Sequence, residues 1–274
     1  MDEKIFTLKY KNQRGKSYFK SIYVSINLFK LYLISFLFFF SIEQEIDESI
    51  LNYSSIELKV KGPGYSNIFY TSKNNKNCIE AISPDEIQIN NRSSNYSQSM
   101  KYYFDLDENN VILKWYDKTV TSLSCFFYYC ENITYVDFSH FNSTYVQSVS
   151  YLFFNCSGLT SVNFDNFIPS PIIDIHYMFY NREKLVSIDS SNFDTSKVVD
   201  MVYLFNGCRN LKYINLSNKF DTSSVTNMDR MFFNCKRLSA LNLSNFKTSN
   251  VSNMDHMFAN CFILVSLDLS NFDT

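Results

Sequence analysis

With 274 residues, the chain is long enough to form two structural regions. Its 25 basic and 27 acidic side chains give a net charge of −2, which excludes the strong positive field of a nucleic-acid-binding protein. Apolar residues make up 46% and aromatic residues 18%, with only five glycines and four prolines, so a disordered or collagen-like chain is excluded as well. We therefore expect a folded protein.

The N-terminal residues 1–48 have the charge pattern of a targeting segment. Residues 1–20 carry six basic side chains, residues 23–42 are mostly apolar, and four acidic side chains come next in residues 43–48. Basic residues before an apolar stretch and acidic residues after it favour an N-terminus on the inside and export of the rest of the chain. We predict a hydrophobic helix here.

Three interpretations of this apolar stretch stay open. Residues 31–42 have the length of a signal-peptide core, but the small residues of a cleavage site are missing. Counted from Tyr23 the stretch reaches 20 residues, the length of a membrane span, although Asn27 and Lys30 lie within it. A cleaved signal peptide, a retained anchor that contacts the membrane, and a buried core helix all fit these features.

Residues 49–118 are predicted to form a small β-rich module. Segment 56–60 alternates apolar and polar residues, segment 61–64 is a Lys-Gly-Pro-Gly turn, and segments 86–89 and 111–115 are further short-strand candidates. The plainest role of this module is to cap the apolar end of the repeats that come after it.

Residues 119–274 contain six repeats of about 26 residues, the last of them incomplete. Five repeats are aligned by a cysteine, Arg182 stands at the same place in the remaining one, and the extra residue Lys219 explains a single interval of 27. The aligned cysteines are Cys130, Cys156, Cys208, Cys235 and Cys261. Because the last repeat stops partway, we expect either a longer array or a partner over the open end.

Each repeat has two periodicities. In the fifth repeat, Val225, Met228, Phe232 and Cys235 are spaced three, four and three apart, which predicts one face of a short helix. Leu241 and Leu243 alternate as in a strand. A helix and a strand per repeat predict an α/β leucine-rich-repeat solenoid. Its expected core includes Phe153, Phe179, Phe205, Phe232 and Phe258, with Cys156, Cys208, Cys235 and Cys261.

The repeat text resembles that of a known family. Residues 238–261, LSALNLSNFKTSNVSNMDHMFANC, are similar to the 26-residue repeat of the BspA-family leucine-rich repeat surface proteins. The resemblance covers about residues 119–274 and is most specific in the last four repeats, while Phe126 and segment 168–171 depart from it. It implies an exported or surface-attached protein that acts by adhesion or protein binding, without enzymatic activity.

The cysteines and histidines show no catalytic or metal-binding spacing. Export would permit disulfides, but the total of seven cysteines is odd and Arg182 interrupts their row, so we favour buried thiols acting as small hydrophobes. Cys78, Cys125 and Cys130 are the least certain members of that row. No pair of cysteines has the C-x₂-C spacing typical of a zinc site. His140, His176 and His256 fall at unrelated places in their repeats, as surface residues do.

No glycine-rich phosphate loop occurs, and no serine or cysteine nucleophile stands in a recognisable motif beside a histidine. We therefore predict that the protein is not an enzyme and binds no metal or cofactor.

A polar stripe is the best candidate for a binding surface. One residue near the end of each predicted strand is always Asp or Asn, and strand alternation points it away from the core. The stripe consists of Asp137, Asn163, Asp189, Asn215, Asn242 and Asp268. Tyr135, Lys212 and Tyr213 lie beside it and are the expected partner contacts. A solvated face that only keeps the strands soluble and in register explains the same pattern.

Together these patterns predict a cell-surface or secreted binding or adhesion protein, membrane-anchored if the N-terminal segment is retained. Its partner would be a protein or another cell-surface ligand, and not nucleic acid. A passive structural or spacer protein of the cell envelope is the alternative.

Overall fold

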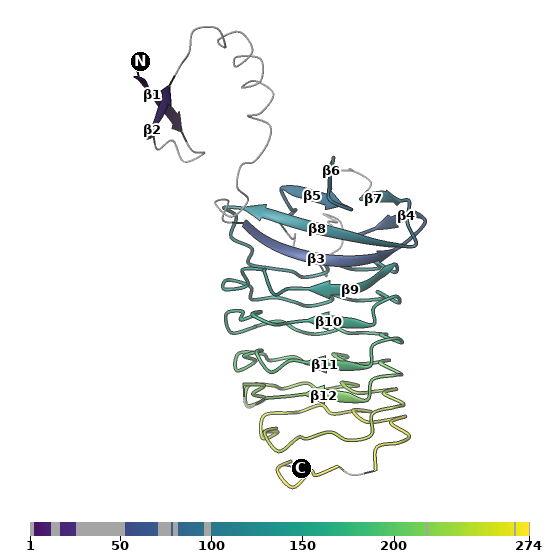
Figure 1. The fold of residues 1–274 in the computed structure, drawn as a ribbon. Helices are drawn as coiled ribbons and strands as arrows, with labels where there is room; N and C mark the ends of the chain where they lie inside the picture. Colours follow the sequence, from purple (N-terminus) through teal and green to yellow (C-terminus); the bar gives the residue numbers. More distant parts are fainter. Residues whose placement is uncertain are drawn as a thin grey trace. The chain divides into compact units, whose positions relative to one another are not determined.

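The computed structural model describes residues 3–11, 17–25, 53–70, 78, 82–95, 100–217, 219–265 and 267–273. The chain divides into two compact units, Met1–Asn52 and Tyr53–Thr274. In the first unit, strand β1 (Glu3–Lys11) pairs antiparallel with strand β2 (Ser17–Ser25), so the basic N-terminal residues of these ranges lie in a hairpin (Figure 1).

The hydrophobic helix expected at residues 23–42 begins inside strand β2, so its first residues, 23–25, are extended instead of helical. The remainder of that segment, residues 26–42, lies outside the described residues. Across the part of the chain that the structure describes, no helix has the length and apolar character needed to cross a membrane.

The second unit begins with a β-rich region. Strand β3 (Tyr53–Lys61) alternates buried and exposed residues and pairs antiparallel with β8 (Glu108–Tyr116). Strand β5 (Glu86–Ile89) pairs with both β8 and β6 (Arg92–Ser94), while β4 (Gly64–Asn67) and β7 (Lys101–Phe104) form a separate pair. On its other edge, β3 pairs antiparallel with β9 (Ile133–Asp137), the strand of the first repeat.

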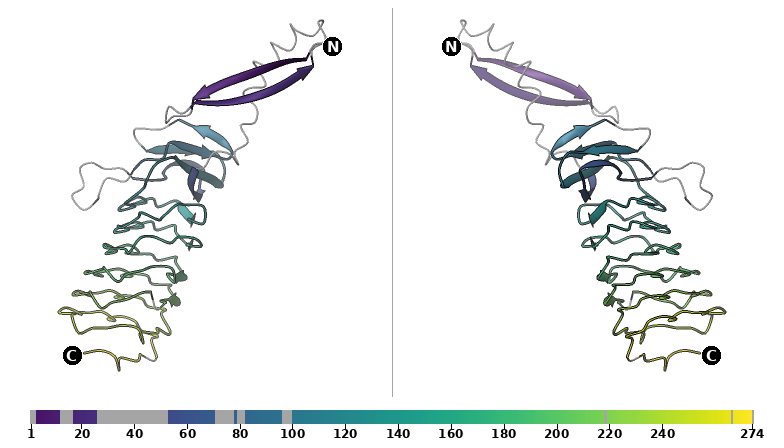
Figure 2. Two further views of the ribbon diagram at one scale, coloured as in Figure 1. Left: turned by 90° about the vertical axis from the view of Figure 1, so that its left-hand side faces the viewer. Right: turned by 90° about the vertical axis from the view of Figure 1, so that its right-hand side faces the viewer.

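Each repeat forms one coil, a turn of chain that lies next to the preceding one, with β9 to β12 along the same side (Figures 1 and 2). Strand β10 (Ser161–Asn163) pairs parallel with β9, and β11 (Ser187–Asp189) pairs parallel with β12 (Tyr213–Asn215). Val136 lies opposite Val162, and Ile188 lies opposite Ile214. The 26-residue spacing of the cysteines is thus also the register of the paired strands.

The predicted α/β leucine-rich-repeat solenoid is wrong, because the described residues contain no helix and their regular structure consists of small β-sheets. Two equivalently placed residues of every coil have the left-handed backbone conformation, which ends any helix within a turn. In the second coil these residues are Tyr151, with φ of 54°, and Asn155, with φ of 55°. The expected helix is therefore replaced by a series of turns.

Backbone hydrogen bonds in these turns alternate in direction. Within one coil, Phe154 donates its N–H to the carbonyl of Tyr151 at 3.0 Å. Between coils, Tyr151 donates to His176 and Phe153 donates to Met178, each also at 3.0 Å. Half of the N–H groups thus close local turns and half join the next coil, which satisfies backbone groups that would otherwise be buried without a partner.

The core is built from repeated places in the coils. Phe127, Phe153, Phe179, Phe205, Phe232 and Phe258 form one column, with neighbouring ring centroids 5.4 to 5.7 Å apart. Cys130, Cys156, Cys208 and Cys235 are buried free thiols, and Cys261 is partly exposed. Cys78 and Cys125 form a disulfide, so these two cysteines do not belong to the row of free thiols.

Candidate functional site

Four residues of the polar stripe end strands β9 to β12, whereas Asn242 and Asp268 lie in coils where the described residues form no strand. Asp137 accepts the N–H of Ser139 at 2.8 Å, and Asp189 accepts the N–H of Ser191 at 2.9 Å. Such side-chain bonds to the backbone two residues on are the Asx turns that end strands. Asn163, Asn242 and Asp268 make the same bond to Asp165, Ser244 and Ser270. Most members of the stripe thus have a local structural role.

Neighbouring coils are also joined along this stripe. Asn163 donates to Asp137 at 3.2 Å, and Asn215 donates to Oδ1 of Asp189 at 3.1 Å. Tyr135 donates to Oδ2 of Asp137 at 2.8 Å; burial and this bond raise the pKa of Tyr135 to about 12. Burial alone would raise the pKa of Asp137, but the bonds from Ser139, Tyr135 and Asn163 outweigh it and lower that pKa. The Asp137 carboxylate thus already accepts hydrogen bonds from three neighbouring residues.

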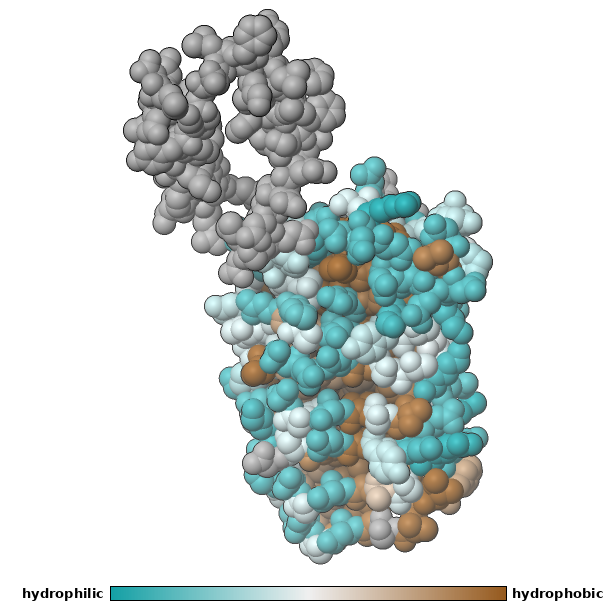
Figure 3. All heavy atoms as spheres, viewed as in Figure 1, coloured by the Kyte–Doolittle hydropathy of each residue, from teal (hydrophilic) through white to brown (hydrophobic). Residues whose placement is uncertain are grey.

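The three expected contact residues beside the stripe do not form one site. Tyr135 is held by Asp137, whereas Tyr213 is 63% exposed. Lys212 lines a separate hollow on the adjoining edge of the coils. Figure 3, which views this strand side, shows polar surface interrupted by apolar residues along its middle.

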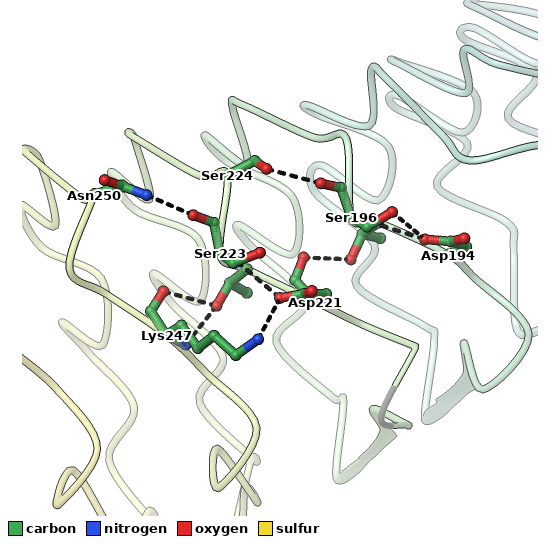
Figure 4. A network of polar contacts seen from close by, with 9 residues as sticks. Asp194, Ser196, Asp221, Ser223, Ser224, Lys247 and Asn250 are labelled. Atoms are coloured by element: carbon green, nitrogen blue, oxygen red, sulfur yellow. Dashed lines mark hydrogen bonds and ion pairs between the residues drawn. The ribbon is translucent and has the colours of Figure 1, made fainter.

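A second polar network joins the loops of successive coils at the Asp-Thr-Ser segments (Figure 4). Asp194 accepts both the N–H and the hydroxyl of Ser196, and Asp221 accepts the N–H of Ser223 at 2.9 Å. Ser224 donates to the carbonyl of Ser196 at 2.8 Å, and Asn250 donates to that of Ser223 at 2.7 Å. These bonds connect each loop to the next, so the network holds neighbouring coils in position.

The most distinctive surface is formed by aromatic side chains at two places of the first four coils. We call it the aromatic face. It consists of Tyr128, Tyr151, Phe154, Tyr177, Tyr180 and Tyr203, all partly exposed. Tyr177 stacks between Tyr151 and Tyr203 with ring centroids 4.8 and 4.7 Å away and ring planes within 6° of parallel. Both faces of its ring are covered, so its exposed part is the ring edge.

One file of stacked rings consists of Tyr151, Tyr177 and Tyr203, and a second file lies beside it. Phe154 stacks between Tyr128 and Tyr180 at centroid distances of 5.0 and 4.8 Å. The two files touch, since Tyr151 lies 5.5 Å from Phe154 and Tyr177 lies 5.5 Å from Tyr180. They form a continuous sheet of rings whose side chains are already fixed by their neighbours.

The margins of the aromatic face carry additional rings and charges. Tyr129, 46% exposed, meets Tyr128 edge to face at 4.7 Å. The imidazole of His176 lies 5.0 Å from the Tyr151 ring and pairs with Asp174. Asp174 is mostly enclosed; burial would raise its pKa, but the bonds and charge of His176 lower it, together with the hydroxyls of Ser150 and Ser148.

The coil itself does not require these rings. At the place of Tyr151, Tyr177 and Tyr203, the fifth and sixth coils have Arg230 and His256 with the same left-handed backbone. At the place of Phe154 and Tyr180, the fourth and sixth coils have Asn206 and Ala259. None of these aromatic residues was predicted from the sequence to belong to a functional surface. Their recurrence every 26 residues was the available signal.

Within the described ranges, no three His, Cys, Asp or Glu side chains come together to hold a metal ion. Burial raises the pKa of Cys156 to about 11 and that of Cys208 to about 12, which keeps these thiols protonated and unreactive.

Comparison with known proteins corrects the family expected from the repeats. One family model, described as "Mycoplasma protein of unknown function, DUF285", matches residues 66–188, 95–214 and 173–274. Neither a BspA family nor a leucine-rich-repeat family is found, so the resemblance drawn from residues 238–261 is wrong. No curated protein and no solved structure matches the chain. Because the matched ranges together span residues 66–274, the chain belongs to the DUF285 family of proteins of unknown function.

Proposed function

We propose that this protein is a non-catalytic binding protein and that the aromatic face contacts its protein partner. The observation that carries this proposal is the pair of stacked files, Tyr151 with Tyr177 and Tyr203, and Tyr128 with Phe154 and Tyr180. The coils can be built without them, as Arg230 and His256 demonstrate at equivalent places. Rings that the fold does not need, left partly exposed, are available for recognition.

The geometry suits a protein surface as the partner. Tyrosine is enriched at protein interfaces because its ring supplies apolar contact area and its hydroxyl supplies a hydrogen bond. Stacking already restricts the Tyr177 side chain, so binding would cost little further side-chain entropy. Ring edges carry partial positive charge and favour acceptors such as carbonyl and carboxylate oxygens.

Action at the cell surface or after secretion is part of the same proposal. The Cys78–Cys125 disulfide supports it, because disulfides persist mainly in oxidising compartments outside the cytosol. The basic, apolar and acidic order of residues 1–48 supports it as well.

A passive spacer is the second candidate, and the ladder between coils favours it. Backbone bonds such as Phe205 to Met231 and Phe232 to Met257, each 2.9 Å long, recur along the coils and would make them stiff. A spacer needs no recognition surface, so it leaves the tyrosines of the aromatic face without a role. The two candidates therefore differ in what those tyrosines do.

The test uses substitutions that the chain itself contains at equivalent places of other coils. Tyr129→Asn, Tyr177→His and Tyr180→Asn reproduce Asn155, His256 and Asn206 and should leave the coils folded. The matched control changes the strand side instead, with Asp189→Lys and Tyr213→Ala. Circular dichroism and thermal unfolding would verify that both variants fold.

The measurement is saturation binding of the labelled full-length chain to intact cells, with unlabelled chain as competitor. We expect saturable binding that weakens about tenfold or more in the aromatic variant, since interface aromatics are common hot spots, and that persists in the strand-side variant. Loss in the strand-side variant alone would transfer the contact to the polar stripe. Absence of saturable binding by the unmodified chain would favour the spacer.

A further inference from the structure

A hollow of about 460 Å³ lies on one edge of the last three coils, away from the residues of the aromatic face. It is lined by Lys212, Lys236, Arg237, Ser239, Phe262 and Ile263. Three consecutive coils contribute to it, since Lys212 belongs to the fourth coil, Lys236 to the fifth and Phe262 to the sixth. The hollow thus depends on the register of the coils.

Phe262 and Ile263 are exposed at a place where earlier coils expose polar residues. The residue directly after the aligned cysteine, or after Arg182 in the third coil, is polar and exposed in the first five coils. These residues are Glu131, Ser157, Glu183, Arg209 and Lys236. The sixth coil has Phe262 there, 70% exposed, and next to it Ile263, 47% exposed. Their exposure results from this side position in the coil, and the coil itself has no need of apolar residues there.

The cations of the hollow have no acidic partner among the described residues. Lys212, Lys236 and Arg237 are exposed and take part in none of the ion pairs of that part of the chain. Lys236 lies over the ring of Phe262, with Nζ 5.8 Å from the ring centroid. Positive charge is therefore concentrated beside an apolar floor, on a chain whose net charge is −2.

The charges of the neighbouring coils restrict the kind of partner. Further along the same edge, Arg209 is neutralised by Glu183 at 2.9 Å, and Glu131 is exposed. An anionic membrane, which is broad and flat, would meet these carboxylates as well as the cations. A free phosphate would use the cations but leave Phe262 and Ile263 without a role. A short acidic segment with an apolar side chain uses both features and reaches no further than the hollow.

We propose that this hollow binds an acidic peptide segment of a partner protein, with an apolar side chain on Phe262 and Ile263 and carboxylates at Lys212, Lys236 and Arg237. The proposal deepens the proposed binding function and adds a second contact to the aromatic face. Charge complementarity would accelerate association and select the partner, and the apolar contact would slow dissociation.

The experiment is a fluorescence-anisotropy titration of the full-length chain with a short labelled peptide in which leucine is flanked by glutamates. We expect saturable binding that weakens as the salt concentration rises. The variant Lys236→Glu with Arg237→Asn, and separately Phe262→Ser, should weaken it about tenfold each. The three introduced residue types already occur at equivalent places of other coils, as Glu183, Asn210 and Ser157. The coils should therefore remain folded.

The matched control is Lys197→Glu with Lys219→Asn, which changes the net charge equally at two lysines outside the hollow. It should bind the peptide like the unmodified chain. The proposal is overturned if the glutamine version of the peptide binds equally well, if the hollow variants bind normally, or if vesicles containing phosphatidylglycerol bind while the peptide does not. Failure here with retained aromatic-dependent cell binding would leave the proposed function standing.

Discussion

Arg230 closes the file of stacked tyrosines that ends at Tyr203. Its guanidinium carbon lies 5.6 Å from the centroid of the Tyr203 ring, and its Nη1 donates to the Tyr203 hydroxyl at 3.1 Å. Asp229 holds the same Nη1 at 2.7 Å, so the cation is fixed in place over the ring. A charged residue thus covers the ring face that a further tyrosine would have covered.

Replacing Arg230 by alanine should lower the urea midpoint of unfolding, because the exposed face of Tyr203 would lose its cation–π contact. Arg230→Tyr should preserve the midpoint, since the left-handed backbone of Arg230 matches that of Tyr203. Urea unfolding monitored by tyrosine fluorescence measures both. Equal midpoints for the alanine variant and the unmodified chain would contradict a stabilising role of this cation.

Arg182→Cys should stabilise the protein by about 1 to 4 kcal/mol. Arg182 is 0% exposed, and its Nη1 and Nη2 have no hydrogen-bond partner among the described residues, although Nε donates to the carbonyl of Tyr180 at 3.0 Å. Burial lowers the pKa of this guanidinium, which reflects the cost of a charge in the core. Cysteine occupies the same place in the other coils, as at Cys156 and Cys208.

The free energy of unfolding of the Arg182→Cys variant is obtained from urea titration under reducing conditions. If the free energy of unfolding decreases instead, the Arg182 guanidinium stabilises the folded chain more than its single hydrogen bond to Tyr180 indicates.

Stability should fall between about pH 10 and pH 12 because of Tyr177. Burial and the neighbouring Tyr151 and Tyr203 raise the pKa of Tyr177 from 10.0 to about 12. Above pH 10 the unfolded chain releases this proton while the folded chain keeps it. The stabilising contribution is therefore complete below pH 10 and is lost as the pH rises through 12.

The measurement is the thermal midpoint as a function of pH for the unmodified chain and for Tyr177→Phe, which keeps the ring but does not ionise. The variant should lose less stability over this range. Identical pH profiles would show that Tyr177 ionises like a free tyrosine.

Thiol labelling should distinguish Cys261 from the other cysteines. Cys130, Cys156, Cys208 and Cys235 are buried, whereas Cys261 is partly exposed, and a hydrogen bond from Cys235 lowers its pKa. Under native, non-reducing conditions we expect one fast-reacting thiol, which Cys261→Ser removes. In denaturant without reductant five thiols should react, because Cys78 and Cys125 are joined. Seven reactive thiols under that last condition would refute the disulfide.

The hydrogen bond from Asn215 to Asp189 predicts a charge effect along the polar stripe. Asn215→Asp places a second carboxylate where the amide stands 3.1 Å from Asp189, so the midpoint of unfolding should fall, and fall less at high salt. Exchanging the two residues, with Asp189→Asn and Asn215→Asp, restores an amide beside a carboxylate. Recovery of the midpoint in the exchanged variant is the control, and its absence would mean that the contact between the coils is unimportant.

The sequence revealed the spacing of the coils but not their conformation. The spacing of Val225, Met228, Phe232 and Cys235 suits one face of a helix, yet it also arises when right-handed and left-handed turns alternate and point the same residues inward. Periodicity alone does not separate these cases. The residue before the aligned cysteine or arginine separates them in five of the six coils, where it is Asn155, Asn181, Gly207, Asn234 or Asn260. Asparagine and glycine favour the left-handed region, and only the first coil has another residue there, Tyr129.

The candidate surfaces were harder to predict than the core. Strand alternation placed Asp137 and Asp189 near the strand ends, but their local bonds to Ser139 and Ser191 depend on turn geometry. The stacking of Tyr151 on Tyr177 depends on how closely the coils approach, which residue types do not reveal. Phe262 resembles a core residue in sequence, and only the coil path shows that it faces outward.

Backbone hydrogen bonds alternate between turns within one coil and contacts to the next coil. Each coil is therefore a structural unit that could be inserted or removed as a whole. Backbone hydrogen bonds join neighbouring coils, as between Phe153 and Met178. These contacts do not depend on which side chains occupy the outer places of the coil. Inserting one more coil with tyrosine at those places would lengthen the aromatic face by about one ring spacing, 4.7 to 4.8 Å, without redesigning the core. Duplication and loss of whole coils would thus lengthen or shorten the stack in fixed steps, and substitution at the outer places would change its surface independently.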